Sequence, residues 1–517
     1  MRSLQNCLTG PRDPERPAVV GPDGTLVWSA LLDRARRLAA YLGPHPSPVM
    51  IYGHKQPAMV AGVLAALRLG RPYMPVDSIT PPGRISRMLA IAEPTHVVLA
   101  EDAPPALASE LAARRIATIA LDPLATNVPE PHGDAPVSPP DPESSAYVLF
   151  TSGTTGDPKG VPIPRAALEH FVDWLLATHR FVPGGETFLN QAPLSFDLSV
   201  MDLYGALATG GTLFTVSRDE IADARRLFAR LDGAPLTAWV STPSFARFCL
   251  AEPRFDEAML PALRRFLFCG ETLGNDVARQ LLARFPVAEV WNMYGPTETT
   301  VAVTATRITE AEAASDEPLP VGRAAPGIDV WIADWDDPMR RRPPGVDGEI
   351  IIAGRQVAAD YLGRPSDAAP EARRAGPFFI IPDGRRAYRS GDSGSLDASH
   401  MLFCAGRLDR QIKLHGYRIE LEEVEAHLRA VDGVSDAAVL TVDRGGRPDF
   451  LVAFVVGDGR EDSPLPEHSR PLTRQVRDAL AGSLPPYALP RVVRRVPALP
   501  LTANGKIDRH TLAEMLG

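Results

Sequence analysis

A short glycine- and hydroxyl-rich segment at residues 151–160, TSGTTGDPKG, contains the residue types that bind phosphate groups. Small residues let backbone N–H groups approach phosphate oxygens, the hydroxyls add donors, and the ammonium of Lys159 adds positive charge. The segment is not a Walker A loop, because a proline precedes the lysine. A flexible surface turn is the alternative interpretation. We predict a phosphate-binding loop that uses Thr151, Ser152, Gly153, Thr154, Thr155, Gly156 and Lys159.

Lysine is rare in this chain, with four residues among the 54 lysines and arginines. A chain that uses arginine at nearly every basic position keeps lysine by chance, or where a planar guanidinium cannot replace a compact ammonium. Lys159 lies in the phosphate-binding loop, and Lys506 lies in the segment 499–509, LPLTANGKIDR. These two lysines are therefore candidates for direct roles in chemistry, whereas the sequence around Lys55 indicates none.

The bulk composition excludes several classes of protein. A chain of 517 residues suggests two to four domains or subdomains, and a formal charge of −9 argues against nucleic acid as the main ligand. Because the four cysteines are far apart, they indicate neither a disulfide framework nor a zinc site. The N-terminal residues lack an apolar core and no run approaches the roughly 18 apolar residues of a membrane span, so we expect a cytoplasmic protein.

The elements that position the candidate residues alternate along the chain. Short apolar runs at 147–150, 237–240 and 263–269 predict strands, and residues 225–231 predict a helix. This alternation is typical of parallel α/β layering. The proline- and acid-rich stretch 122–145 predicts an exposed connector just before the phosphate-binding loop.

A second, smaller domain is expected at the C-terminal end. The sequence predicts a strand at 411–414, a charged helix at 420–429, and strands at 436–442 and 450–456. This stretch is long enough to form a small α+β core of its own. We therefore expect an N-terminal domain at residues 1–408, a hinge near Asp409 and a mobile lid at residues 410–517.

Further segments carry motif-like patterns in a fixed order: LRLGRPYMPVD (67–77), SFDLSVMDLYGAL (195–207), NMYGPTETT (292–300), GEIIIAGRQVAADYLG (348–363), YRSGDSG (388–394), GRLDRQIKLHGYRIE (406–420) and LTANGKIDR (501–509). Together with the loop at 151–160, they resemble the core motifs of the adenylate-forming superfamily. That family includes acyl-CoA synthetases, luciferases and nonribosomal adenylation domains. The resemblance implies an α/β fold with a large N-terminal domain of several subdomains and a small α+β C-terminal lid. It also implies ATP and Mg²⁺ as cofactors.

The resemblance assigns nucleotide contacts to residues whose chemistry suits them. Tyr294 offers an aromatic face to adenine, and Asn292 offers an amide to the exocyclic amine. Asp392 can accept both ribose hydroxyls, and Arg407 lies where the family contacts ribose or phosphate. Glu298 is the hard oxygen ligand expected for magnesium. Turn residues and ordinary surface ion pairs are the alternatives. Gly295 and Thr297 complete the nucleotide set.

Lys506 matches the residue with which the family holds the substrate carboxylate against the α-phosphate. A preorganised donor at such a position typically contributes a factor of about 10²–10³ in rate. A three-donor ammonium can contact oxygens of two different groups, whereas a guanidinium imposes a flat bidentate geometry. In the second half-reaction, the resemblance places the segment 413–416, which contains Lys413, at the site instead.

Substrate selectivity is expected from a separate set of residues. Asp197 matches the family aspartate that pairs with a substrate α-amine, and a helix-capping role is the alternative. Fatty-acid and aryl-acid activators have no such need, so Asp197 disfavours an acyl-CoA synthetase. An apolar wall excludes charged or strongly polar substrate side chains. The resemblance places on that wall Leu198, Met201, Val240, Leu267, Cys269, Met293, Val301 and Ala302.

The segments 188–204, 239–250 and 266–273 look most similar to D-alanine–carrier protein ligases. In those ligases, the position of Cys269 helps to set the preference for the D enantiomer. Two departures concern specificity and nucleotide binding. Met293 replaces a smaller threonine at the pocket floor, which makes glycine or L-alanine plausible, and Cys404 replaces a tyrosine near the nucleotide.

The sequence thus predicts a stand-alone ligase that forms aminoacyl-AMP from a small amino acid, D-alanine foremost. The eight residues after Arg509 leave no room for a phosphopantetheine-bearing module, so we expect the carrier protein to act in trans. A stand-alone adenylation enzyme for glycine, L-alanine or another small amino acid in a peptide natural-product pathway is the first alternative. A non-catalytic nucleotide-binding regulator is the alternative from another class.

Overall fold

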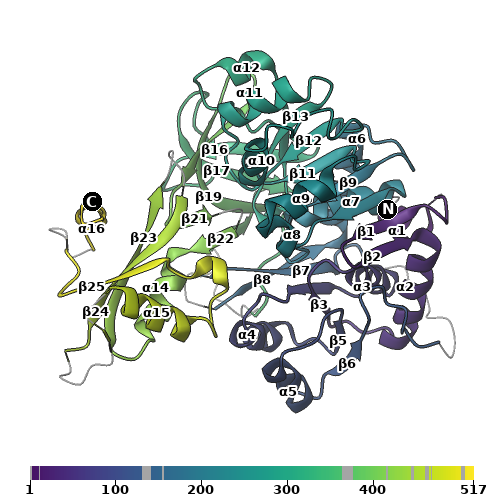
Figure 1. Cartoon of the computed structure of the whole chain (residues 1–517). Coiled ribbons are helices and arrows are strands. Elements are labelled where there is room, and N and C mark those ends of the chain that lie inside the picture. Colours follow the sequence, from purple (N-terminus) through teal and green to yellow (C-terminus); the bar gives the residue numbers. More distant parts are fainter. Residues whose placement is uncertain are drawn as a thin grey trace. The chain divides into compact units, whose positions relative to one another are not determined.

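The computed structural model describes residues 3–10, 12–130, 141–153, 157–363, 376–414, 417–443, 448–459, 465–466, 469–501 and 507–516. The chain divides into two compact units (Figure 1). Unit 1 comprises Met1–Ser78, Ile91–Leu149 and Gly160–Leu408, and unit 2 comprises Ile79–Ala90, Phe150–Lys159 and Asp409–Gly517.

The largest sheet of unit 1 has nine strands and a parallel centre. Its central strands β1, β10, β9, β11, β12 and β13 pair in parallel, and antiparallel strands complete both edges. Because parallel strands end at the same edge, their carboxyl ends gather the loops that follow them. In spatial order the strands are β15 (Arg323–Ala324), β14 (Thr304–Ile308), β13 (Glu289–Tyr294), β12 (Arg265–Phe268), β11 (Ala238–Ser241), β9 (Thr187–Asn190), β10 (Thr212–Thr215), β1 (Pro17–Gly21) and β2 (Gly24–Val27).

A second sheet has six strands, with parallel pairing from β6 through β7. Its strands are rich in buried Val, Ile, Met and Tyr, as expected for a sheet covered on both faces. In spatial order they are β6 (Ala117–Ala120), β5 (His96–Leu99), β3 (Val49–Gly53), β4 (Tyr73–Asp77), β7 (Ser145–Thr151) and β8 (Lys159–Pro164).

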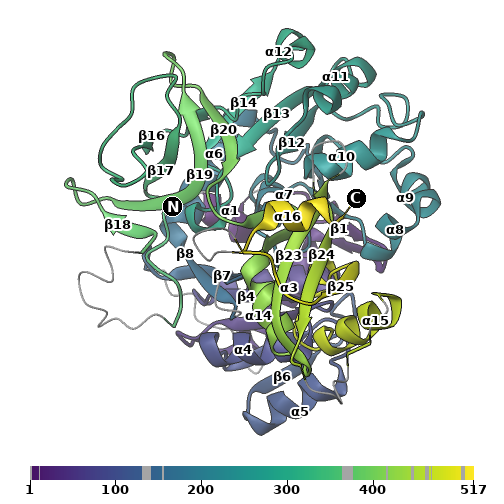
Figure 2. The same ribbon diagram turned by 90° about the vertical axis from the view of Figure 1, so that its left-hand side faces the viewer.

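The third sheet of unit 1 is antiparallel throughout (Figure 2). Its long strand β19 pairs β17 along one edge and both β18 and β20 along the other, so β19 carries Asp392 and pairs it with Arg407 of β20. The strands are β16 (Ile328–Ala333), β17 (Gly348–Gly354), β18 (Phe378–Ile380), β19 (Arg386–Leu396) and β20 (Leu402–Arg407).

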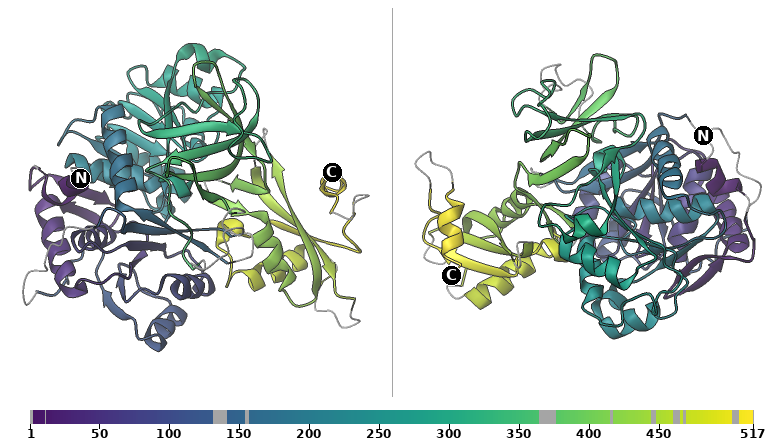
Figure 3. Two further views of the ribbon diagram at one scale, coloured as in Figure 1. Left: turned by 180° about the vertical axis from the view of Figure 1, so that it is seen from behind. Right: turned by 90° about the horizontal axis from the view of Figure 1, so that it is seen from above.

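Helices pack on the two parallel sheets of unit 1, whose buried side chains belong to two large apolar clusters. Helix α7 packs on β9, β10 and β11, while α3 packs on β3 and β4, and α2 packs on α3 near the N-terminus (Figure 3). The expected helix at 225–231 forms as α9, whose first turn is capped by the side chain of Asp223. The helices are α1 (Ser3–Thr9), α2 (Trp28–Leu42), α3 (Pro57–Arg68), α5 (Pro105–Ala113), α6 (Arg165–His179), α7 (Leu198–Thr209), α8 (Arg218–Ala222), α9 (Ala224–Leu231), α10 (Pro243–Leu250), α11 (Asn275–Arg284) and α12 (Glu310–Ala314), with the 3-10 turn η1 (Thr297–Thr299).

Unit 2 forms a small α+β core of its own. The strands expected at 411–414, 436–442 and 450–456 form as β21, β23 and β24, and the helix expected at 420–429 forms as α14. An apolar cluster that includes Val424, Leu428, Val439 and Ala453 holds these elements together. Its elements are β21 (Gln411–Leu414), β22 (Tyr417–Glu420), α14 (Leu421–Arg429), β23 (Val434–Asp443), β24 (Pro448–Gly457), α15 (Ser469–Leu480), η2 (Pro486–Ala488), β25 (Val492–Val496) and α16 (Arg509–Glu514); most of α4 (Pro82–Ala92) also belongs to unit 2.

Lys55, for which the sequence indicates no role, fastens the two parallel sheets of unit 1 to each other. Its ammonium donates to the carbonyl oxygens of Asn190 (3.4 Å), Gln191 and Val216 (2.8 Å), which lie at the carboxyl ends of β9 and β10. The side chain is 3% exposed, and burial lowers the pKa of Lys55 to about 8. Three acceptors around one nitrogen suit a tetrahedral ammonium and not a planar guanidinium.

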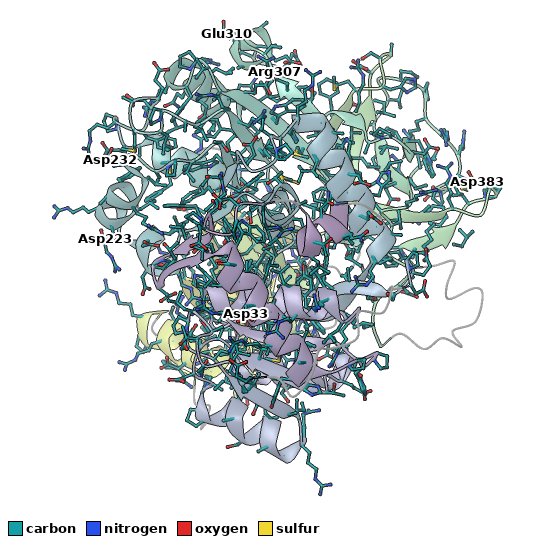
Figure 4. All side chains as sticks on the ribbon, turned by 90° about the vertical axis from the view of Figure 1, so that its right-hand side faces the viewer. Asp33, Asp223, Asp232, Arg307, Glu310 and Asp383 are labelled. Carbon is teal, nitrogen blue, oxygen red and sulfur yellow. The ribbon has the colours of Figure 1, made fainter. Side chains whose placement is uncertain are left out.

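Some charged residues at the surface of unit 1 pair with near neighbours in the sequence. Asp33, labelled in Figure 4, pairs with Arg36 and Arg37 on the same helix, and Asp383 pairs with Arg385. Such exposed pairs contribute little to stability. Within the described ranges, no helix combines the length and hydropathy that a bilayer crossing needs.

Candidate active site

The predicted pocket wall is formed by residues near the carboxyl ends of β11, β12 and β13, in the segments that follow β12 and β13, and on α7. Val240 of β11 pairs with Leu267 of β12, and both face one apolar cluster. Their neighbours Trp239 and Phe266 face a different cluster, as the alternation of a strand requires. The arrangement brings together every predicted wall residue in the first cluster, each at most 6% exposed: Leu198, Met201, Val240, Leu267, Cys269, Met293, Val301 and Ala302.

Asp197 stands at the start of α7, next to this wall. Its Oδ2 accepts a hydrogen bond of 2.6 Å from the hydroxyl of Thr297, and it is only partly buried. Although Asp197 occupies the N-cap position, its side chain makes no capping hydrogen bond. The alternative of a helix-capping role is therefore wrong, and the carboxylate is directed to the loop that follows β13 instead.

The predicted ribose and adenine contacts form one hydrogen-bonded group. Asp392 accepts from the hydroxyl of Tyr294 at 2.5 Å through Oδ2 and from Nη1 of Arg407 at 2.9 Å through Oδ1. Burial, and then the neighbouring Asp392, raises the pKa of Tyr294 well above its ordinary value, so the phenol keeps its proton and donates. This group holds the carboxylate in one orientation.

Asn292 lies on β13 two residues before Tyr294 and is 2% exposed. Its Nδ2 donates to the carbonyl oxygen of Pro320 at 2.8 Å, whereas its buried Oδ1 has no hydrogen-bond partner. An unpaired buried acceptor is costly unless a water molecule or a ligand donor satisfies it. An exocyclic amine is a donor of this kind.

Glu298 is fully buried in the turn η1. Its Oε1 accepts from the hydroxyl of Tyr361 at 2.7 Å, and its backbone carbonyl accepts from Ala358 N at 2.9 Å. Among the residues that the structure describes, no group of three or more His, Cys, Asp or Glu side chains could hold a metal ion. A metal at Glu298 would therefore have at most two such side chains of the described residues as ligands, with further oxygens from its bound substrate.

The predicted phosphate-binding residues, the hinge residue and Lys506 either belong to unit 2 or lie outside the described residues. Thr151, Ser152, Gly153 and Lys159 belong to unit 2, in which the hydroxyl of Ser152 donates to the carbonyl oxygen of Arg418 at 3.3 Å. Asp409, the predicted hinge, is the first residue of the last segment of unit 2. Thr154, Thr155, Gly156 and the catalytic candidate Lys506 lie outside the described residues, as does part of the segment 413–416.

The sequence analysis did not predict the residues that hold Glu298 and the backbone of residues 299–302 in place. Tyr361 contacts Glu298, and Gln356 contacts the backbone of residues 299–302. Both lie in the segment 348–363 that the resemblance singled out, so their position was a usable signal. His170 on α6, which contacts Gln356, carries no such signal.

Comparisons with known proteins cover nearly the whole chain. A family model described as AMP-binding enzyme matches residues 9–362, and one described as AMP-binding enzyme C-terminal domain matches residues 423–506. The D-alanine–D-alanyl carrier protein ligase of Bacillus velezensis is 40% identical over 509 residues, which are 97% of this chain and 96% of that protein. The enzyme of the same name from Bacillus thuringiensis is 40% identical over 511 residues, 96% of each chain.

Solved structures give the same fold. The Vibrio cholerae adenylation domain AlmE, in complex with glycyl-adenosine-5'-phosphate, has a TM-score of 0.80 at 24% identity and covers 99% of this chain and 97% of its own. A nonribosomal peptide synthetase protein with adenylation and PCP domains, bound to a vinylsulfonamide inhibitor, has a TM-score of 0.78 at 26% identity over 97% of this chain and 82% of its own.

Proposed function

The chain belongs to the AMP-binding enzyme family and is an ATP-dependent, AMP-forming ligase, and we propose that it activates D-alanine for a separate carrier protein. The relatives that are 40% identical over nearly the full chain carry that activity in their names. The observation that carries the proposal is Asp197, a partly buried carboxylate directly before Leu198, the first residue of the apolar wall.

In the proposed binding mode, Asp197 holds the α-ammonium of the substrate, and the apolar wall receives its side chain. Charge-assisted hydrogen bonds of this kind are the stronger ones in proteins. Because Cys269, Val301 and Ala302 are buried and apolar, we propose that the wall rejects charged side chains and accepts one of about the size of a methyl group. This selects a small, neutral amino acid.

For the nucleotide, we propose that Oδ1 of Asn292 accepts the adenine amine and that Asp392 accepts the ribose hydroxyls. Both oxygens of Asp392 have one donor each in the structure, from Tyr294 and Arg407, and each oxygen keeps room for a second. Gly295 and Thr297, which lie in the segment after β13, complete the proposed nucleotide contacts. The phosphates are proposed to bind to the loop at 151–160, with its Lys159.

Magnesium fits Glu298 because Mg²⁺ is usually bound through one or two carboxylates together with substrate phosphates. When bound, the ion neutralises charge on those phosphates. The role of the protein is to hold Glu298 rigidly, which the hydrogen bonds from Tyr361 and Ala358 achieve.

The proposed reaction has two steps. A carboxylate oxygen of the amino acid attacks the α-phosphorus of ATP, the bond to the β-phosphate oxygen breaks, and pyrophosphate leaves. The phosphopantetheine thiol of the carrier then loses its proton and attacks the acyl carbonyl, and AMP leaves. We assign the first step to Lys506, and we propose that the lid at 410–517 then rotates about Asp409 relative to residues 1–408. A cytoplasmic location, where ATP is available, is part of this proposal.

Amino-acid-dependent exchange of pyrophosphate into ATP tests the proposal directly. D-alanine should support the fastest exchange in a panel that includes L-alanine, glycine and D-serine. Purified carrier protein in its phosphopantetheine form should then become acylated. Exchange with none of these substrates, together with nucleotide binding, would instead support a non-catalytic nucleotide-binding regulator.

Met293 favours a second candidate substrate. It is 2% exposed in the same apolar cluster as Cys269. A thioether occupies more of the pocket floor than a short side chain would, and a smaller pocket favours glycine. Faster exchange with glycine than with D-alanine, reversed by Met293→Thr, would establish this alternative.

A further inference from the structure

We propose that Gln356 is a positioning residue that sets the shape of the amino-acid pocket through the main chain of residues 299–302. The proposal rests on the proposed function, because it concerns the same pocket. Gln356 contacts the wall residue Ala302 only through its main-chain carbonyl, so it acts through the backbone of the loop that carries two wall residues.

The loop after η1 has an unfavourable backbone. Thr300 has φ 62° and Val301 has φ 69°, so two consecutive β-branched residues lie in the left-handed region. Such residues are rarely found there, and the conformation is unfavourable unless the surrounding structure fixes it. Some other part of the molecule must therefore hold this loop.

Gln356 supplies that support from a fully buried position directly after β17. Its Nε2 donates to the carbonyl oxygen of Ala302 at 2.8 Å, with longer contacts to those of Thr299 (3.3 Å) and Thr300 (3.4 Å). Its own backbone carbonyl accepts from the hydroxyl of Thr300 at 2.8 Å. One residue thus contacts the loop on both sides of Val301.

His170 holds the amide of Gln356 in the required orientation. Its Nδ1 lies 2.9 Å from Oε1 of Gln356, and its Nε2 lies 2.8 Å from the carbonyl oxygen of Pro326. Because Nε2 of Gln356 already faces carbonyl oxygens, the amide cannot flip without placing an acceptor against acceptors. Through His170 and Gln356, helix α6 therefore fixes the position of the loop at residues 299–302.

The loop in turn shapes the amino-acid pocket. The thiol of Cys269 lies 3.6 Å from the carbonyl oxygen of Val301, and Val301 and Ala302 are themselves wall residues. Glu298, by contrast, is held separately by Tyr361 and Ala358. Loss of the Gln356 contacts should therefore disturb amino-acid selection more than nucleotide binding.

The test compares Gln356→Met, which keeps the volume but removes the donors, with the matched variant Gln280→Met on the exposed face of α11. Exchange kinetics are measured with D-alanine, L-alanine and ATP. We expect Gln356→Met to raise KM for D-alanine at least tenfold and to lower the D to L ratio of kcat/KM at least fivefold. The KM for ATP should change less than about twofold, and Gln280→Met should match the wild type. A methyl-sized change in a pocket commonly has effects of about 10- to 200-fold.

A folded Gln356→Met enzyme with unchanged KM for D-alanine and unchanged enantiomer ratio would overturn the proposal. Equal losses for ATP and D-alanine would also overturn it, because they would indicate general structural damage. Should Gln356→Met fail to fold, His170→Phe removes the partner of the amide together with the contact to Pro326. The proposal requires the same difference between the KM values for D-alanine and ATP in this variant. Wild-type enzyme without D-alanine exchange would refute the proposed function instead, so the two failures are distinguishable.

Discussion

Replacing Asp197 with asparagine tests the amino-acid site most directly, because the change removes a charge and preserves the shape. In the structure, this carboxylate is partly buried and accepts a hydrogen bond from Thr297 at 2.6 Å. The substrate ammonium would add a charge-assisted hydrogen bond to it. Such a bond contributes about 1.5–3 kcal/mol. With 1.36 kcal/mol for each factor of ten, the loss in kcat/KM should be roughly 10- to 160-fold.

The assay is pyrophosphate exchange with D-alanine and with propionate, which has the same carbon chain but no amine. Asp197→Asn should lower kcat/KM for D-alanine by the stated factor and leave that for propionate within about threefold. Asp232→Asn, at an exposed position labelled in Figure 4, is the matched control and should behave as the wild type. An unchanged value for D-alanine, or equal losses for both acids, would refute the assignment of Asp197 to the ammonium.

Three further predictions concern stability and the first chemical step. Burial lowers the pKa of His179 to about 3 from an ordinary 6.5, so below pH 6.5 the unfolded chain binds a proton that the folded chain does not. Stability should therefore fall by about 2 kcal/mol between pH 8 and pH 5, and urea unfolding of His179→Phe should lack this decrease. Lys55→Met leaves the carbonyl groups of Asn190, Gln191 and Val216 buried without this donor. This variant should lower the free energy of unfolding by about 3 kcal/mol or more in the same assay. Lys413→Met, at an exposed position, is the control and should lower it by less than about 0.5 kcal/mol. Lys506→Ala should slow adenylate formation by about 10²–10³-fold, and intact D-alanine-dependent exchange in this variant would contradict the catalytic assignment.

Local patterns in the sequence predicted much of the secondary structure. The strand at 411–414 forms with the expected bounds, and the helix at 225–231 begins one residue earlier. These elements have a clear periodicity or a capping residue, which acts over a few positions along the chain. The eight wall residues, assigned by resemblance, do gather in one apolar cluster.

Contacts between distant segments could not be predicted in this way. Lys55 meets carbonyl groups more than 130 positions away, and His170 meets Gln356 186 positions away. Neither contact is indicated by a local or periodic pattern in the sequence. The left-handed backbone at Thr300 and Val301 runs against the preference of β-branched residues, so local propensity predicts a different conformation there.

The burial of the Lys55 ammonium against three carbonyl groups has a practical consequence for the chemical labelling of amines. Amine-selective reagents modify lysine ammonium groups that solvent can reach, and the buried Lys55 is shielded by its three carbonyl partners. The other lysines are Lys159, Lys413 and Lys506, and each lies in a segment assigned to phosphate binding or to one of the two reaction steps. Lys413 is exposed and Lys159 partly so. Apart from reaction at the α-amino group, an amine-reactive fluorophore would therefore report on the segments assigned to phosphate binding and to the two reaction steps, without any engineered cysteine.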